Sequence, residues 1–330
     1  MPPLPQDMNL NEIKAPIARH MAAFDGHFRG AMQSKVPLLS VITQYIVKRK
    51  GKQIRPLFVF FAADLFSGIT QRTYRAATLI EMLHTATLIH DDVVDDSNER
   101  RGFFSLNALW KNKISVLVGD YLLSRGLLLA LEHEDFDLLK IVSNSVREMS
   151  EGELLQMEKA RALNINEEVY FEIIRKKTAS LIASCLASGT ASAGQPSEVV
   201  EKMRQIGEYI GIAFQIKDDI LDFDFSGLKG KPTGGDIKER KMTLPLIYTL
   251  VNSDKGTRRK IIGIVKNEGS NWERVSWLIE KIRASGGIEY ASAQMTRYRN
   301  LALEALNEMP DTPARQSLKQ LIDFTIERKH

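Results

Sequence analysis

The sequence predicts an all-α protein, built as a single-domain helical bundle around a central cavity. Apolar residues recur at helical spacing through most of the 330 residues. The chain shows no alternation of strands and helices, no repeat of short fixed period and no linker that divides it. We therefore expect one domain over residues 1–330, in which the Pro-rich residues 1–7 form a flexible arm.

The first helices lead to a cationic loop. Regularly spaced apolar residues predict an amphipathic helix over residues 8–33 and a second helix over residues 38–49. Lys52 and Arg55 follow on a short loop, and Pro56 is placed as in the first turn of the next helix. Because a helix N-terminus attracts anions, this loop is a candidate anion site.

An acidic cluster ends the long helix predicted over residues 74–95. Asp91 and Asp95 are four residues apart, so their side chains share one face, with Asp92 beside them. Like charges at this spacing oppose folding unless a positive charge lies between them. The same D-D-x-x-D spacing returns more than a hundred residues later, at Asp218, Asp219 and Asp222.

A single D-D-x-x-D turn is most often only a solvated helix face. Here each copy follows an apolar run, residues 79–89 or residues 206–216, so the acids end buried helices. Carboxylate oxygens suit hard divalent cations, and Mg²⁺ completes its coordination with water and substrate phosphate oxygens. The expected substrate is therefore a phosphate or diphosphate ester.

Further polar residues accompany the two clusters. Arg100 and Arg101 follow the first cluster, and arginine suits a bidentate grip on phosphate. Lys177 and Thr178 precede a strongly apolar segment, where a snorkelling surface lysine is the simpler interpretation. Gln215 lies four residues before Asp219 and shares its face.

The rest of the chain continues the helical pattern. Residues 226–236 form a Gly-rich loop with Lys231 that is able to close over a phosphate, although it is not a Walker A sequence. Further helices are expected over residues 57–66, 114–131, 135–162, 167–193, 196–222, from 243 onward, 257–267, 271–285, 287–308 and 313–327.

Composition excludes several classes of protein. The net charge of +4 fits anionic substrates better than nucleic acid, because no Lys/Arg stripe is interleaved with aromatic residues. The single Cys185 excludes an internal disulfide and fits a reducing compartment, as an inert buried thiol. We see no signal peptide and no uninterrupted apolar run long enough to span a membrane, so we expect a cytoplasmic protein.

Taken together, these motifs resemble those of the trans-isoprenyl diphosphate synthases, also called polyprenyl synthetases, and among them the octaprenyl and heptaprenyl types. The likeness runs over residues 51–245. It departs at Gln53, where many relatives have a basic residue, and at Arg240, where glycine often precedes the lysine. The resemblance implies an all-α homodimer with an active site inside each subunit.

The resemblance also implies roles for individual residues, with Lys177 among the catalytic ones. The aspartates that it implies as catalytic ligands of about three Mg²⁺ ions, with Mn²⁺ as an alternative, are Asp91, Asp92, Asp95, Asp218, Asp219 and Asp222. Its isopentenyl diphosphate site falls on Lys52, Arg55, His84 and Arg101. Its allylic diphosphate site falls on Arg100, Lys177, Thr178, Gln215, Lys231 and Lys241.

The residues agree with this chemistry. Breaking an allylic carbon–oxygen bond creates a carbocation and a diphosphate, and metals with fixed cations stabilise the leaving group. If the departing diphosphate takes the proton, no general base from the protein is needed, in keeping with the absence of a Ser/His/Asp or Cys/His arrangement. The apolar helices below the acids exclude water from the cation and house the growing chain.

Product length should depend on the bulk below the first acidic cluster. Ala86 and Thr87 precede Asp91 by five and four residues, where relatives that stop at fifteen carbons commonly carry aromatic side chains. Both residues are small here, and Leu83 and Ile80 lie further down the same general side. We therefore expect a long all-trans product of about C30–C40 for quinone side chains. Candidate residues for the floor of the tunnel are Tyr121 and Leu122.

Alternative functions remain open at this point. A short-chain farnesyl or geranylgeranyl diphosphate synthase shares all of these motifs. Class I terpene cyclases usually lack the isopentenyl-binding set, so Lys52, Arg55 and Arg101 count against a cyclase. A catalytically silent regulatory subunit typically loses acids from one cluster, whereas both are intact here. A helical scaffold is less favoured still, and peripheral contact with a membrane is expected only for product release.

Overall fold

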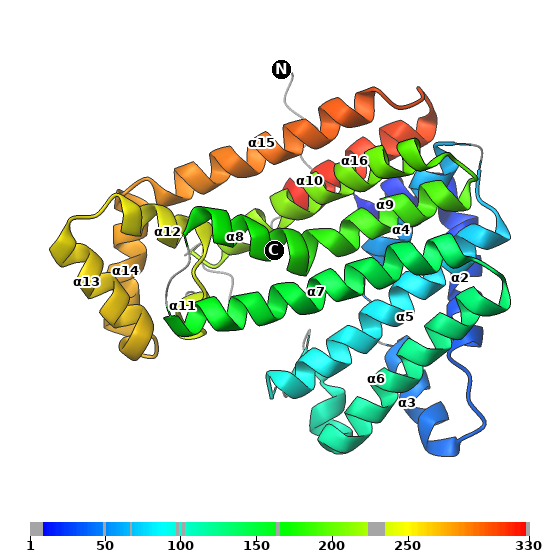
Figure 1. Cartoon of the computed structure of the whole chain (residues 1–330), viewed down its shortest axis with the longest axis horizontal. Helices are drawn as coiled ribbons and strands as arrows, with labels where there is room; N and C mark the ends of the chain where they lie inside the picture. The colour runs from blue at the N-terminus through cyan, green and yellow to red at the C-terminus, as the bar shows by residue number, and fades with distance from the viewer. Residues whose placement is uncertain are drawn as a thin grey trace. The chain divides into compact units, whose positions relative to one another are not determined.

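The computed structural model describes residues 9–48, 51–66, 68–96, 99–100, 103–162, 166–223 and 235–327 (Figure 1). Over these residues the chain is helical, apart from two strands of two residues each, β1 (Glu99–Arg100) and β2 (Phe103–Phe104), which pair antiparallel. The prediction of an all-α fold is confirmed. The proposed arm, residues 1–7, lies outside the described residues.

The chain divides into two compact units. The first contains residues up to Val146, Ser184–Arg204 and Met309–Leu321. The second contains Arg147–Ala183, Gln205–Glu308 and the residues from Ile322 onward. The single domain over residues 1–330 stays a prediction.

Two helices of the first unit differ from the predicted ones in their bounds. Pro16, which has no backbone N–H to donate, lies in a 3₁₀ turn that splits the helix predicted over residues 8–33. Ser105 accepts the N–H of Ala108 at 3.0 Å and so begins α6 eight residues before the predicted start. The helices of this part are α1 (Leu10–Lys14), α2 (Ala18–Ala31), α3 (Pro37–Lys48), α4 (Ile54–Asp64), α5 (Gln71–Val94) and α6 (Leu106–Glu132).

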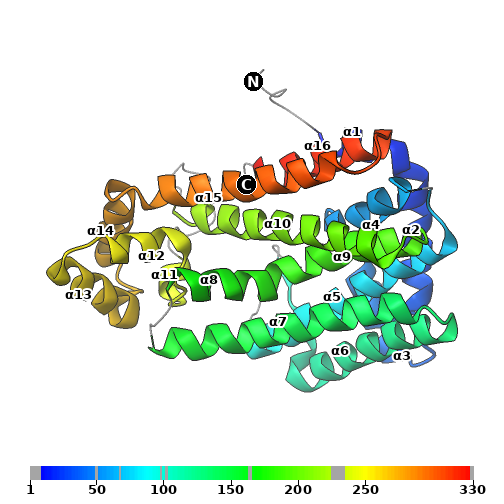
Figure 2. The same cartoon turned by 45° about the horizontal axis from the view of Figure 1, so that its top comes forward.

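Helix α5 is the centre of the first unit. It packs against α2, α4 and α6, and both views show α6 running alongside it (Figures 1 and 2). An aromatic cluster joins α2, α4 and α5, because the ring of Phe60 meets those of Phe24 and Tyr74 edge-on at 5.8 and 5.3 Å. Burial of such side chains contributes about 1.5–3 kcal/mol each. The N-terminal part of α5 is therefore held by a packed core.

Helix α6 is the most membrane-like of the described helices by length and composition. Of the described helices it alone is long and apolar enough to cross a membrane, judged by length and composition. One third of its most apolar window, 33%, is buried within the protein, and core helices of soluble proteins meet the same criterion. Asp120 and Arg125 interrupt this helix, so it contains no uninterrupted apolar run of membrane-spanning length.

The second unit has its own apolar core, in which α12 packs against α14 and α15. Fully buried residues include Phe223, Leu246 and Leu278. The helix predicted over residues 167–193 is interrupted by a π-helical turn at Arg175–Ala179. The remaining α-helices among the described residues are α7 (Phe136–Ala162), α8 (Glu167–Ile174), α9 (Ser180–Ser192), α10 (Ser197–Leu221), α11 (Gly235–Lys238), α12 (Leu244–Val251), α13 (Lys255–Gly263), α14 (Trp272–Ala284), α15 (Gly287–Asn307) and α16 (Pro313–Glu327). A second π-helical turn, Ile264–Glu268, follows α13.

Candidate active site

The first acidic cluster lies at the C-terminal end of α5. Asp91 and Asp92 are in the last turn, and Asp95 caps the helix through its N–H, which donates to the carbonyl oxygen of Asp91 at 2.8 Å. Asp92 is buried, Asp91 is half-buried and Asp95 is exposed. The last turn carries no basic residue, although a helix C-terminus already has a partial negative charge. This end of the helix therefore attracts cations.

The second acidic cluster lies at the C-terminal end of α10, whose last turn also lacks a basic residue. Asp219 is buried, and both of its carboxylate oxygens accept hydrogen bonds: Oδ2 from the hydroxyl of Tyr170 at 2.7 Å and Oδ1 from Nε2 of Gln215 at 2.9 Å. Burial raises the pKa of Asp219 to about 7, even though both hydrogen bonds favour the charged form. A bound cation would offset the cost of burying the charged Asp219 carboxylate.

Asp222 anchors the segment that follows the second cluster. Its two carboxylate oxygens accept the backbone N–H groups of Gly235 and Asp236, each at 3.1 Å, at the start of α11. Burial raises the pKa of Asp222 and raises that of Asp236 to about 6. Lys241 lies 3.5 Å from Asp236 and 2.6 Å from Glu239, and although burial lowers its pKa, the pairing with these carboxylates raises it overall. Lys241 thus remains charged beside the acids.

Arg240, where relatives often have glycine, lies directly before Lys241. Arg240 has a φ of 58°, a left-handed conformation that glycine adopts without a steric penalty. Gln53, the other departure, also has a left-handed backbone, with φ 54°, and its amide donates to Asp25 at 3.0 Å. The side chain of Gln53 is therefore directed to α2 by this hydrogen bond.

Replacing Arg240 by glycine should stabilise the protein. We expect Arg240→Gly to raise the free energy of unfolding by about 0.5–1 kcal/mol, because relief of the left-handed strain exceeds the added entropy of the unfolded chain. Urea denaturation measures this change. The matched control is Arg259→Gly in the exposed face of α13, which should lower stability by about 1 kcal/mol. Equal losses in both variants would contradict the role of the backbone conformation.

Lys177 and Thr178 lie in the π-helical turn, a feature that is frequent at functional sites. Nζ of Lys177 forms an ion pair with Glu153 and lies 3.3 Å from Oε1 of Gln156 on α7. The hydroxyl of Thr178 donates to Oε1 of Gln215 at 2.8 Å. The structure thus brings Thr178, Gln215 and Asp219 into one hydrogen-bonded chain.

Glycine 152 permits this arrangement of α7 against the π-helical turn. A Cβ at Gly152 would lie 2.8 Å from the backbone nitrogen of Lys177 and 2.9 Å from Cβ of Lys176. Both distances are too short for a side chain, so a glycine allows α7 to approach closely. Lys176 in turn pairs with Glu151 at 3.3 Å.

Two cations of the predicted isopentenyl diphosphate site, Lys52 and Arg55, lie at the N-terminal end of α4 in the first unit. Nε of Arg55 lies 2.6 Å from Oε1 of Glu81, and Nη2 lies 3.4 Å from Oε2, so one carboxylate holds the guanidinium. His84 follows Glu81 by one helical turn and is half-buried. Lys52 is exposed just before α4. Arg101, Lys231 and the side chain of Arg100 lie outside the described residues.

The residues predicted to set product length line α5 and α6. Ile80, Leu83 and Ala86 are buried, and Thr87 is half-buried with its hydroxyl donating to the carbonyl of His84 at 2.9 Å. Gly126 of α6 lies over this face, since a Cβ there would lie 3.3 Å from Leu79. Of the two floor candidates, Leu122 is fully buried and Tyr121 donates to the carbonyl of Gln33 at 2.7 Å.

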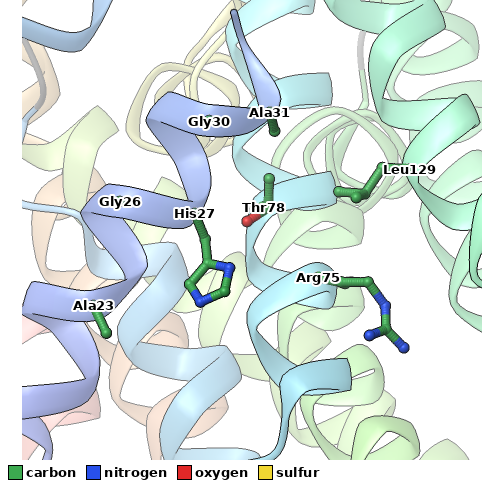
Figure 3. Close-up of a pocket in the computed structure, with 8 residues that line it drawn as sticks. All are labelled: Ala23, Gly26, His27, Gly30, Ala31, Arg75, Thr78 and Leu129. Carbon is green, nitrogen blue, oxygen red and sulfur yellow. The ribbon is translucent and has the colours of Figure 1, made fainter.

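A cavity of about 510 Å³ lies between α2, α5 and α6 in the first unit (Figure 3). Gly26 and Gly30 form one side, and the hydroxyl of Thr78 points into it without a hydrogen-bond partner. Thr78 precedes Asp91 by thirteen residues, about 20 Å along the helix at 1.5 Å per residue. This cavity is therefore separate from the metal-binding end of α5 that the sequence predicts.

The six aspartates fit a hard divalent ion by their chemistry. Every donor is a carboxylate oxygen, the preferred ligand of Mg²⁺ and Ca²⁺. Among the described residues, no three side chains of His, Cys, Asp or Glu converge to form a metal site by themselves. The ligand roles of the aspartates and the common cavity between the two clusters stay predictions.

Sequence reasoning missed three residues of this region. Tyr170, Glu81 and Asp236 each contact a predicted site residue, Asp219, Arg55 and Lys241 respectively. Tyr170 precedes Lys177 by seven residues, about two helical turns, and this spacing places it on the same predicted helix face as a site residue. Glu81 lies one turn before His84 and offered a similar signal.

Comparison with known proteins identifies the fold and the family. A model of the polyprenyl synthetase family matches residues 36–282. The all-trans-nonaprenyl-diphosphate synthase (geranyl-diphosphate specific) of Rhodobacter capsulatus is 36% identical over 321 residues, which cover 96% of this chain and 97% of that protein. A crystal structure of polyprenyl synthase from Caulobacter crescentus CB15, complexed with calcium and isoprenyl diphosphate, is 31% identical, with a TM-score of 0.89 and coverage of 99% and 100%.

A third relative has a different named product. The crystal structure of a geranylgeranyl pyrophosphate synthase from Bacteroides thetaiotaomicron is 37% identical, with a TM-score of 0.82 and coverage of 97% of this chain and 99% of that chain. The matched segments contain the loop before α4 and both acidic helix ends. The chain therefore belongs to the polyprenyl synthetase family, the prenyltransferases that act as trans-prenyl diphosphate synthases.

Proposed function

We propose that this enzyme condenses isopentenyl diphosphate with an allylic diphosphate to make a long all-trans polyprenyl diphosphate of about C30–C40, with Mg²⁺ as its metal. The observation that carries the proposal is the pair of aspartate-rich helix C-termini, neither of which has a basic residue in its last turn. Such sites favour cations, and a cation suits a diphosphate substrate.

The chain's own residues have distinct parts in this reaction. When bound, Mg²⁺ supplies positive charge to the departing diphosphate. Asp91, Asp92, Asp95, Asp218, Asp219 and Asp222 would hold it. Lys177, Lys241 and Arg55 each carry a carboxylate partner in the protein, at Glu153, Asp236 and Glu81, so each charge is fixed in position before substrate arrives. Fixed charges stabilise a leaving group without costly reorganisation.

The preference for a long product rests on two small residues of α5, Ala86 and Thr87. Ala86 is buried and Thr87 is half-buried, and neither side chain is large enough to block a growing chain. A short-chain synthase is the alternative, since relatives of comparable identity are named for both long and short products. Mass analysis after incubation with farnesyl diphosphate, isopentenyl diphosphate and Mg²⁺ separates these functions. Arrest at fifteen or twenty carbons would overturn the long-chain proposal. A cyclic hydrocarbon would indicate a terpene cyclase, and the absence of any product would indicate a silent subunit.

We propose that the enzyme is a homodimer that pairs through α6. Val116, Leu117, Leu128 and Leu131 are exposed and lie on one face of this helix. Exposed apolar side chains that share one helix face are typical of interaction surfaces. The apolar composition of α6 is then explained by burial between two copies of the chain.

Substitution at this face should change the oligomeric state. Leu117 is 67% exposed, and we expect Leu117→Asp to convert the dimer to a monomer, because a carboxylate loses hydration when buried between two copies. Light scattering coupled to size-exclusion chromatography measures the mass. Val251→Asp in the second unit, where Val251 is 66% exposed, should leave the mass unchanged. A dimer that survives Leu117→Asp would place the interface elsewhere.

The proposal extends to the cellular setting. The diphosphate substrates are soluble in water, whereas a chain of about C30–C40 is a membrane lipid. We therefore propose a cytoplasmic enzyme that serves quinone side-chain synthesis and contacts membranes peripherally as it releases product. Flotation with anionic vesicles after a round of synthesis tests this contact.

A further inference from the structure

Tyr170 holds the carboxylate of Asp219, yet none of the roles described above uses it. It lies on α8 and is 4% exposed, and its hydroxyl donates to Oδ2 of Asp219 at 2.7 Å. The two residues are 49 positions apart in the chain. The contact therefore depends on the packing of α8 against α10 within the second unit.

The second oxygen of the same carboxylate is also fixed. Oδ1 of Asp219 accepts from Nε2 of Gln215 at 2.9 Å, and Oε1 of Gln215 accepts from the hydroxyl of Thr178 at 2.8 Å. The Thr178 bond orients the amide, since it occupies Oε1 and leaves the NH₂ group for Asp219. A carboxylate offers about four acceptor positions, so about one on each oxygen remains for another ligand.

The ring of Tyr170 is a rigid support for this hydrogen bond. It belongs to the apolar core with Ile173, Ile174 and Ile216, and it meets the ring of Phe171 edge-on at 5.4 Å. A tyrosine side chain has few rotatable bonds, and close packing leaves this one little freedom. The position of the hydroxyl, and with it that of Asp219 Oδ2, is therefore set by the core.

We infer that Tyr170 is a positioning residue, which orients Asp219 so that the open sides of its two oxygens are presented to a divalent cation. The inference rests on the proposed function, because it takes Asp219 as a metal ligand. Partners of this kind typically change metal affinity by tenfold to a hundredfold when they are removed. Tyr170 does not touch the reacting atoms in this assignment and acts only through Asp219.

The protein contains a matched control. Tyr290 of α15 donates to Oε1 of Glu167 at 2.6 Å, so it forms the same type of bond to a carboxylate in the same unit. Glu167 is in the first turn of α8 and belongs to neither acidic cluster. Removing the hydroxyl of Tyr290 tests the general cost of losing a phenol–carboxylate bond.

The experiment compares Mn²⁺ binding by the full-length wild type, Tyr170→Phe, Tyr290→Phe and Asp219→Asn. Electron paramagnetic resonance titrations are made in the presence of a non-reactive thio-analogue of the allylic diphosphate. We expect Tyr170→Phe to raise the Mn²⁺ concentration for half-saturation about tenfold or more, Tyr290→Phe to leave it unchanged and Asp219→Asn to lose at least one bound ion. Amber suppression that replaces the Tyr170 hydroxyl by the amino group of p-aminophenylalanine should restore most of the affinity.

The outcomes separate this inference from the function on which it depends. Wild-type Mn²⁺ binding by Tyr170→Phe, or equal weakening by Tyr290→Phe, overturns the positioning role. Wild-type binding by Asp219→Asn overturns the metal role of Asp219 itself. If Tyr170→Phe fails to fold, the p-aminophenylalanine protein and Thr178→Val, which frees the Gln215 amide, take its place. Both are then titrated with Mn²⁺ alone, because Thr178 is also assigned to the allylic diphosphate site. Unchanged Mn²⁺ binding by Thr178→Val together with no rescue by the amino group also contradicts the inference.

Discussion

Asp219→Asn is expected to lower turnover at least about a hundredfold while the protein remains folded. The substitution removes a charge that the proposed mechanism needs for metal binding. It also removes a charge from a buried position, since Asp219 is 5% exposed and burial raises its pKa to about 7. Incorporation of labelled isopentenyl diphosphate measures the rate, and calorimetry measures the melting temperature.

The same variant has a characteristic pH dependence. The pKa of Asp219 in the folded protein, about 7, lies above the value of about 3.9 for an unfolded chain. The folded state therefore binds the extra proton between these values, so the metal-free wild type loses stability from this group as the pH rises from 4 to 7. The asparagine side chain does not ionise, so Asp219→Asn does not lose this stability. Its melting temperature should therefore exceed that of the wild type above pH 7, and the difference should disappear near pH 4.

The control is Glu201→Gln, which alters an exposed carboxylate of the same helix that pairs with Arg204. This variant should keep its turnover and show no comparable gain in melting temperature. Near-normal turnover in Asp219→Asn would refute the catalytic assignment. A large loss of stability above pH 7 would instead contradict the account of the buried charge.

Ala86→Phe is expected to shorten the product to about fifteen to twenty carbons. Ala86 is 1% exposed on the face of α5 that also carries Leu83, so a phenyl ring there must occupy the space proposed for the growing chain. The added volume should cost about 1–3 kcal/mol of stability. Mass spectrometry of the dephosphorylated products measures their length.

The control for this prediction places the same side chain at an exposed position of the second unit, Val251, which is 66% exposed. Val251→Phe should retain the wild-type product. If Ala86→Phe also retains it, the chain does not grow along this face.

Much of the helical fold could be predicted because helical periodicity is a local signal. The helix predicted over residues 313–327 has the bounds of α16, and α14 begins and ends within one residue of the helix predicted over 271–285. The failures have local causes that periodicity does not reveal. Pro16 lies in a 3₁₀ turn, and Lys111 bends α6 through a backbone with φ 68° and ψ 164°.

The candidate site could be predicted only in part. The acids were recognisable because D-D-x-x-D spacing fixes neighbouring side chains on one helix. Their partners come from other elements: Tyr170 reaches Asp219 across 49 residues of sequence, and Arg55 reaches Glu81 across 26. Such contacts depend on tertiary packing, which is why sequence reasoning assigned Arg55 to a substrate and did not identify the glutamate that holds it.

Because its single cysteine is buried, the native protein should not react with thiol reagents. Cys185 is fully buried in α9, and burial raises the pKa of its thiol, so the reactive thiolate is suppressed. Nitroxide labels attached to cysteines introduced at the exposed Val94 and at Lys202 would report only from those two positions. Echo spectroscopy on such a pair would measure whether the distance between the end of α5 and the Lys202 position of α10 changes when a diphosphate and Mn²⁺ are added.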